Sequence, residues 1–179
     1  PDLGLDARDP RQRAAVVACL RAERPALVVA PESDDPHPDH VEASALVTRA
    51  CYLAGLARFE APGERFRPRR VLYALYRSTR EAHLVVDVTP TFERRMEALR
   101  EHASQLGLGS GAAAGPSTYL THPDFLAEVE ARARTWGASI GVRFGEAYRV
   151  RGPVAIESPE ALIGTAATAA ASGTTGGQA

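Results

Sequence analysis

The sequence predicts an α/β protein in which helices cover both faces of a doubly wound, mostly parallel β-sheet. Two observations support this fold class. Residues 10–23 have a helical pattern and are followed by the short apolar run 26–30; after a polar loop, a second helical pattern covers residues 40–57. This order of helix, apolar strand, loop and helix is typical of proteins that sandwich a parallel sheet between helices.

The first of these helices has clear start and stop signals. Asp9 is a good N-cap residue, Pro10 fits the first helical position, and Pro25 follows the end of the helix. The continuous apolar run from Ala26 to Ala30 predicts a strand buried on both faces of the sheet.

The rest of the chain continues the alternation of strands and helices. Apolar or alternating patterns predict strands over residues 70–76, 84–88 and 144–150, and helical patterns cover residues 91–105 and 122–141. A loop rich in glycine and alanine over residues 107–115 is predicted to be mobile. We expect one domain over residues 1–162 and a disordered Ala/Thr/Gly/Ser-rich tail over residues 163–179.

Composition excludes several classes of protein. The 179 residues have a formal net charge of −1, which gives no reason to expect a nucleic acid or a membrane surface as partner. No apolar run approaches the roughly 20 residues that a membrane-spanning helix needs. Cys19 and Cys51 lie among apolar neighbours, so we expect two buried free thiols and a cytoplasmic protein.

The segment from Asp34 to His40 is the chemically informative one. It places two imidazoles and three carboxylates in seven residues, directly after a predicted strand. Ligands of open α/β sheets bind beyond the carboxyl ends of strands, so this position suits metal-assisted hydrolysis. Turn and capping chemistry at the start of a helix explains the same residues about equally well.

The segment from His37 to His40, after a Val-Val-Ala-Pro strand end, resembles the second signature of the LmbE/PIG-L family of zinc-dependent de-N-acetylases. The similarity continues to about Leu162 and is closest to the bacillithiol-biosynthesis branch, which removes acetate from N-acetylglucosaminyl malate. Further matching strings occupy residues 41–56, 68–71, 86–89, 96–99, 104–105 and 141–146.

This resemblance implies a Rossmann-like, LmbE-type three-layer sandwich and assigns roles to four residues. His40 corresponds to a zinc ligand. His37 corresponds to the group that stabilises the oxyanion or protonates the leaving amine, and Asp39 to the carboxylate that orients and charges it. Arg70 corresponds to an arginine that supports this pair. The family's other zinc ligands and general base belong to an N-terminal His-Pro-Asp-Asp motif, and we expect that segment, with the first strand and helix, to be missing here.

The predicted activity is therefore zinc-dependent hydrolysis of an N-acetylglucosamine conjugate. A homo-oligomer is also compatible with the sequence. The alternative is a non-catalytic remnant that binds a sugar or a partner without a complete zinc site. Pro36 stands where branch members often have an arginine. Either another arginine, from the missing segment or from the connection 65–70, meets the malate carboxylates, or the aglycone is not malate; we expect the first.

Two other candidates are interpreted as structural. The tripeptide His122-Pro123-Asp124 resembles the missing motif but follows no strand, and the start of a helix capped by Thr121 explains it. Glu146 follows a glycine and could border a pocket, although a structural carboxylate is the preferred interpretation.

Overall fold

The computed structural model describes residues 3–77, 81–107 and 118–162. The predicted tail over residues 163–179, and all of the predicted mobile loop except Gly107, lie outside these residues. The described helices and strands are α1 (Pro10–Glu23), β1 (Leu27–Pro31), α2 (Pro38–Ala54), β2 (Arg70–Ala74), β3 (Leu84–Asp87), η1 (Thr89–Thr91), α3 (Phe92–Arg100), α4 (Ala103–Leu106), α5 (Phe125–Ser139), β4 (Gly145–Val150) and η3 (Pro159–Leu162).

The four described strands form one mixed sheet in the order β1-β2-β4-β3. Strand β1 pairs with β2 in parallel, whereas β4 pairs antiparallel with both β2 and β3. The α/β class is confirmed, but the prediction of a mostly parallel sheet is wrong. A short turn after α5 leads directly into β4, so this strand runs back between β2 and β3 and makes both of its pairings antiparallel.

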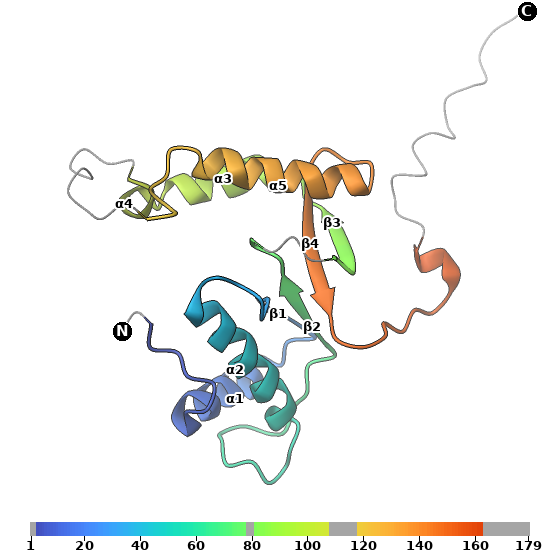
Figure 1. Cartoon of the computed structure of the whole chain (residues 1–179). Coiled ribbons are helices and arrows are strands. Elements are labelled where there is room, and N and C mark those ends of the chain that lie inside the picture. The colour runs from blue at the N-terminus through green and yellow to red at the C-terminus, as the bar shows by residue number, and fades with distance from the viewer. Residues whose placement is uncertain (1–2, 78–80, 108–117, 163–179) are drawn as a thin grey trace, which may run out of the picture.

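The parallel half of the sheet is associated with α1 and α2, which lie together in Figure 1. Their shared core is apolar and contains Val17 and Leu20 from α1 with Ala50, Cys51 and Ala54 from α2. As predicted, α1 begins at Pro10, and the Asp9 side chain accepts a hydrogen bond from the Arg11 N–H. These contacts fix α2 over β1 and β2, and therefore fix the segment at the start of α2.

A buried arginine connects α1 to the loop that follows α2. Arg21 is 5% exposed, and its guanidinium donates to the carbonyls of Ala54, Leu56, Phe59 and Ala61. Carbonyls at the end of a helix lack intrahelical partners, and a buried charge needs hydrogen bonds. The hydrogen bonds of Arg21 therefore satisfy carbonyls at and after the end of α2 and also the buried charge of the guanidinium itself.

The antiparallel half of the sheet is associated with α3 and α5, which run side by side in Figure 1. Their core contains Phe92, Met96, Phe125, Val129 and Phe144, and the Phe92 and Phe144 rings stack 3.8 Å apart. The predicted helix over residues 91–105 is in fact three pieces, η1, α3 and α4. It breaks because His102 leaves the helical conformation (φ −82°, ψ 44°).

Two glycines allow α5 to approach β4 closely. A Cβ on Gly145 would lie 2.7 Å from the Gly137 nitrogen, and one on Gly137 would lie 2.8 Å from the Phe144 nitrogen. These contacts are with backbone atoms, which cannot rotate away as a side chain can. Only glycine fits at this crossing.

Two predictions about burial are wrong. Strand β1 lies at an edge of the sheet, and Leu27 and Val29 are 49% and 51% exposed instead of buried on both faces. Cys51 is buried as predicted, but Cys19 is exposed because the buried face of α1 consists of Val17, Leu20 and Arg21. Both thiols are free, and burial raises the pKa of Cys51. Across the described residues, no helix combines the length and apolar character needed to cross a membrane.

Candidate active site

A cavity of about 710 Å³ lies beyond the carboxyl ends of β1 and β2. This is the position predicted for ligand binding in an open α/β sheet, and the size is typical of small-molecule sites. One group of lining residues, the histidine wall, consists of Asp35, His37 and His40. A second group, the arginine wall, consists of Arg77, Tyr119 and Arg132. Both are lining residues of the same cavity.

His37 is the N-cap of α2, and its backbone is extended (φ −86°, ψ 120°). Its Nδ1 accepts a hydrogen bond of 3.2 Å from the Asp39 N–H, and Pro38 occupies the first helical position. A ring nitrogen that accepts carries no proton, so Nε2 carries the proton in the neutral ring. Capping and chemistry are therefore compatible in His37, because the cap uses one nitrogen and leaves an N–H donor at the other.

His40 lies directly beside His37, and the two rings stack with centroids 4.7 Å apart. The Nδ1 of His40 is buried and lies 3.0 Å from Oδ1 of Asp35, yet it has no aligned hydrogen-bond partner among the described residues. The same Asp35 oxygen accepts the His37 N–H at 2.8 Å. The side chain of Asp35 is only 2% exposed. Asp35 therefore supports both histidines and leaves Nε2 of His40 available as a ligand atom.

The side chains of Asp39 and Arg70 contact backbone groups among the described residues. The Asp39 carboxylate accepts the N–H groups of Leu3 and Leu5, while its own N–H donates to His37. Arg70 donates to the Pro153 carbonyl at 3.1 Å and is not a lining residue of the cavity. The described contacts thus connect Asp39 to residues 3–5, whereas Asp35 lies beside the His40 imidazole and accepts the backbone N–H of His37.

Glu146, Tyr76 and Arg95 are further polar lining residues of the cavity. Glu146 accepts a hydrogen bond of 2.7 Å from the Tyr148 hydroxyl and lies 3.9 Å from the guanidinium of Arg95. The Tyr76 ring lies 5.8 Å from that of His40. Burial, followed by the charge of Glu146, raises the pKa of Tyr76; burial and the hydrogen bond to Glu146 raise the pKa of Tyr148. Both phenols therefore keep their protons at neutral pH and can act as donors.

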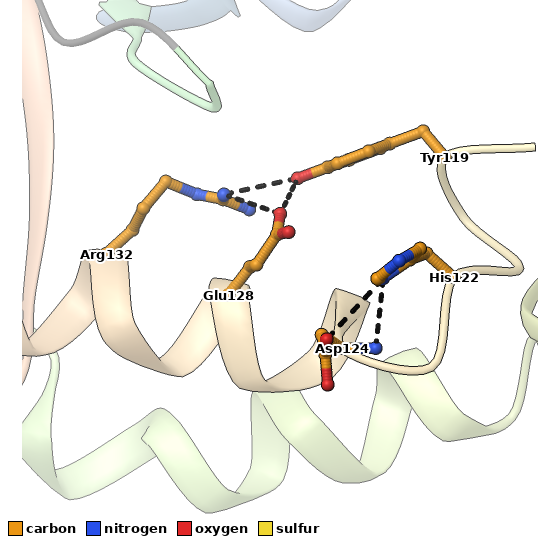
Figure 2. A network of polar contacts seen from close by, with 5 residues as sticks. All are labelled: Tyr119, His122, Asp124, Glu128 and Arg132. Carbon is orange, nitrogen blue, oxygen red and sulfur yellow. Dashed lines mark hydrogen bonds and ion pairs between the residues drawn. The ribbon is translucent and has the colours of Figure 1, made fainter.

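The arginine wall depends on a network that Figure 2 shows from close by. The Tyr119 hydroxyl donates to Glu128 at 2.7 Å and accepts from Arg132 at 3.2 Å. The Tyr119 ring packs edge-on against Phe125 at 5.3 Å, and the Arg77 guanidinium lies 3.7 Å from its centroid. The tyrosine is thus held at its hydroxyl, its edge and its face.

The described residues do not by themselves form a metal centre. No group of three or more His, Cys, Asp or Glu side chains is placed among them to hold an ion. His40 could supply one ligand of such a site through Nε2. Its buried Nδ1 lies beside Asp35, and a ligating imidazole usually has a carboxylate at its other nitrogen. A catalytic zinc needs three protein ligands, and this arrangement supplies one.

The tripeptide that begins at His122 is exposed and lies outside the cavity. His122 Nδ1 accepts the Asp124 N–H at 3.2 Å, and helix α5 begins only at Phe125. The predicted capping by Thr121 is wrong, because its hydroxyl bonds to the neighbouring Thr118. The helix therefore begins three residues later than predicted, at Phe125 instead of residue 122.

Comparison with known proteins shows which fold this is. No family model matches the chain. The conserved protein TT1542 from Thermus thermophilus superposes with a TM-score of 0.75 at 30% identity, over 89% of this chain and 66% of that protein. The N,N'-diacetylchitobiose deacetylase from Pyrococcus horikoshii superposes with a TM-score of 0.59 at 24% identity, over 81% and 54%. The chain has the fold of these proteins.

The same fold also occurs with other chemistry. GalB, the 4-carboxy-2-hydroxymuconate hydratase from Pseudomonas putida, superposes with a TM-score of 0.62 at 15% identity, over 84% of this chain and 62% of that protein. The chain spans just under two thirds of the first of these three proteins and about half of the deacetylase. Because one fold serves several reactions, function has to be argued from the cavity.

Sequence reasoning did not find most of the cavity. It identified His37 and His40 but gave no role to Asp35, and it interpreted Glu146 as structural although this residue lines the cavity. Tyr76 and Arg77 directly follow β2, so the rule about strand ends could have found them. Arg132 shares a helix face with Val129 and Trp136, a pattern that marks a buried stripe but not a cavity wall.

Proposed function

We propose that this chain is part of a hydrolase that removes the acetyl group from an N-acetylglucosamine conjugate. The observation that carries the proposal is the pair of stacked imidazoles at the cavity, with the buried Asp35 beside the His40 ring. The similarity in fold to a chitobiose deacetylase supports the same reaction class. N-acetylglucosaminyl malate is the specific substrate that we propose, because the sequence most closely resembles the bacillithiol branch.

In this proposal His37 is the hydrogen-bond donor to the reacting carbonyl. Its Nδ1 is occupied by the helix cap, so the ring presents an Nε2–H group. As the amide carbon becomes tetrahedral, its oxygen gains negative charge, and a fixed N–H at that position stabilises the charge. The leaving amine would take the proton that the attacking water gives up to the general base.

Zinc is the proposed cofactor, with His40 as one ligand through Nε2. When bound, zinc supplies a Lewis acid that activates water and polarises the acetamide. Asp35 orients His40 from the far side of the ring, as carboxylates commonly do for ligating histidines. We propose that the remaining ligands and the general base come from residues other than those described.

A second candidate is a sugar-binding domain without catalysis. The incomplete donor set favours it, because one imidazole holds zinc weakly. The cavity and its polar lining residues would still suit a sugar.

One experiment separates the two functions. Incubate the protein with N-acetylglucosaminyl malate and one equivalent of zinc, measure release of free amine and of acetate, and measure glycoside binding and zinc binding in parallel. For this chain alone we expect zinc to bind weakly, without a stoichiometric submicromolar site. In a longer protein that adds the proposed remaining ligands and general base to this chain, turnover that disappears in His37→Ala supports the hydrolase. In that protein, binding of the glycoside without release of amine supports the sugar-binding domain and contradicts the hydrolase.

A further inference from the structure

We propose that the arginine wall binds an acidic group on the substrate, so that Arg77, Tyr119 and Arg132 set the preference for an anionic conjugate. The inference rests on the proposed function, because it takes the histidine wall as the place where the acetamide lies. Because both walls line the same cavity, a ligand with its acetamide at the histidine wall would place its acidic substituent against the arginine wall.

Arg77 is the residue whose charge is available for this purpose. Its guanidinium stacks on the Tyr119 ring at 3.7 Å, and no carboxylate of the described residues lies within ion-pair distance of it. A contact with the face of an aromatic ring attracts the cation but does not neutralise its charge, which therefore remains for an anion. The tyrosine therefore orients a cation without neutralising it.

Arg132 adds a second guanidinium whose position is fixed. It donates to the Tyr119 hydroxyl at 3.2 Å and lies 3.6 Å from Glu128, in a pair that is 30% and 44% exposed. Arginine has five N–H donors, so this contact leaves several for a ligand. Two arginines against one partly solvated carboxylate give the wall an excess of positive charge.

The arginine connection considered from the sequence does not reach this cavity. Arg67 stacks on Tyr52 at 4.8 Å, and Arg70 bonds to Pro153; neither is a lining residue. Arg95 does line the cavity, but Glu146 lies 3.9 Å from its guanidinium. Among the described lining residues, the unbalanced positive charge is therefore on the arginine wall.

The test compares two ligands of nearly the same shape. N-acetylglucosaminyl malate carries two carboxylates, and its dimethyl ester is neutral; binding of each is measured by calorimetry on the full chain without metal, so that neither is consumed. We expect the acid to bind more tightly on the order of 10- to 100-fold, the effect of one or two charge-assisted hydrogen bonds. The ratio should fall as ionic strength rises, because salt screens this attraction.

Variants locate the effect. Arg77→Gln should lower the ratio severalfold, mainly by weakening binding of the acid. Arg67→Gln, which removes an arginine stacked on a tyrosine outside the cavity, should leave the ratio as it is. Arg132→Gln should lower the ratio as well, with circular dichroism to check folding. If that variant does not fold, Arg77→Gln alone decides.

The outcomes separate this inference from the proposed function. Equal affinity for acid and ester, or a ratio unchanged in Arg77→Gln, overturns the role of the arginine wall while amino-sugar binding stands. Tight binding of free malate with no contribution from the sugar supports the arginine wall and overturns the amino-sugar substrate. Absence of binding by every ligand overturns both.

Discussion

The tripeptide His-Pro-Asp occurs twice in this chain and folds into the same local turn both times. At His37 and at His122, the imidazole Nδ1 accepts the N–H of the aspartate two residues on, in each case at 3.2 Å. Proline fixes the turn and a helix begins within it or just after it. Local sequence therefore determines this geometry without reference to the rest of the fold.

The surroundings of the two turns differ in every other respect. The first follows a strand of the sheet, has Asp35 beside it and His40 stacked on it, and borders the cavity. The second follows a surface loop, and the side chains of its histidine and aspartate are 56% and 74% exposed. The comparison shows that three residues specify a turn, whereas the strand end and a buried carboxylate are what make a candidate site.

The largest expected effect separates the two turns by activity. If the protein is a deacetylase, His37→Ala should lower kcat/KM by a factor on the order of 10² to 10⁴, because it removes the donor to the oxyanion or the leaving amine. His122→Ala should change it less than about twofold, since an exposed side chain away from the site contributes little. Release of amine under saturating zinc measures both. Similar losses in the two variants would mean that the comparison between the turns is wrong.

The carboxylate beside the first turn is the next target. Asp35→Asn keeps the shape of the side chain and removes its charge, so His40 should lose its orienting carboxylate. We expect zinc affinity or activity to fall by roughly 10- to 100-fold, the usual cost of losing such a partner. Asp124→Asn is the matched change at the second turn and should have no effect on either quantity. Zinc titration with a competing chelator gives the affinity, and an unchanged value in Asp35→Asn would contradict the role given to Asp35.

The third prediction concerns how α5, which begins beside the second turn, is attached to the sheet. Gly145→Ala should destabilise the protein by about 1–3 kcal/mol, because the added Cβ would lie 2.7 Å from backbone of Gly137. Urea unfolding measures the change in free energy of unfolding. Gly55→Ala is an instructive control, since its Cβ would meet the end of the flexible Arg67 side chain and should cost less.

The smallest effect is a pH dependence next to the second turn. The hydrogen bond from Tyr119 is the main cause that lowers the pKa of Glu128 below its ordinary value of 4.5. A lowered folded-state pKa stabilises the protein above the ordinary value, and this contribution disappears as pH falls through the folded-state pKa. Tyr119→Phe should raise the Glu128 pKa in an NMR titration. The loss of stability in this variant should be present at pH 7 and shrink below about pH 4; an unchanged pKa would mean that the bond does not persist in solution.

Local features were predictable from the sequence because local interactions decide them. Asp9 with Pro10 fixes the start of α1, and the turn at His37 fixes the start of α2. The strands at β2, β3 and β4 were found within one or two residues because their patterns are strong.

Features that depend on residues far apart in the chain were not predictable in this way. The antiparallel placement of β4 between β2 and β3, and the close crossing of Gly137 and Gly145, are revealed by no periodic pattern. The arginine wall combines Arg77, from the end of β2, with Tyr119 and Arg132, more than forty residues later. The exposure of Cys19 depends on which face of α1 meets α2, and the apolar neighbours of Cys19 in the sequence gave the wrong answer.

The outer edge of β1 has a consequence for the behaviour of the protein in concentrated solution. Within the described sheet, β1 pairs only with β2, so its other side presents backbone N–H and C=O groups beside the exposed side chains of Leu27 and Val29. An apolar strand edge of this kind can pair with a strand of another molecule. Colloidal stability should therefore depend on this edge, and a lysine in place of Val29 should slow precipitation on storage more than a charge added on an exposed helix face.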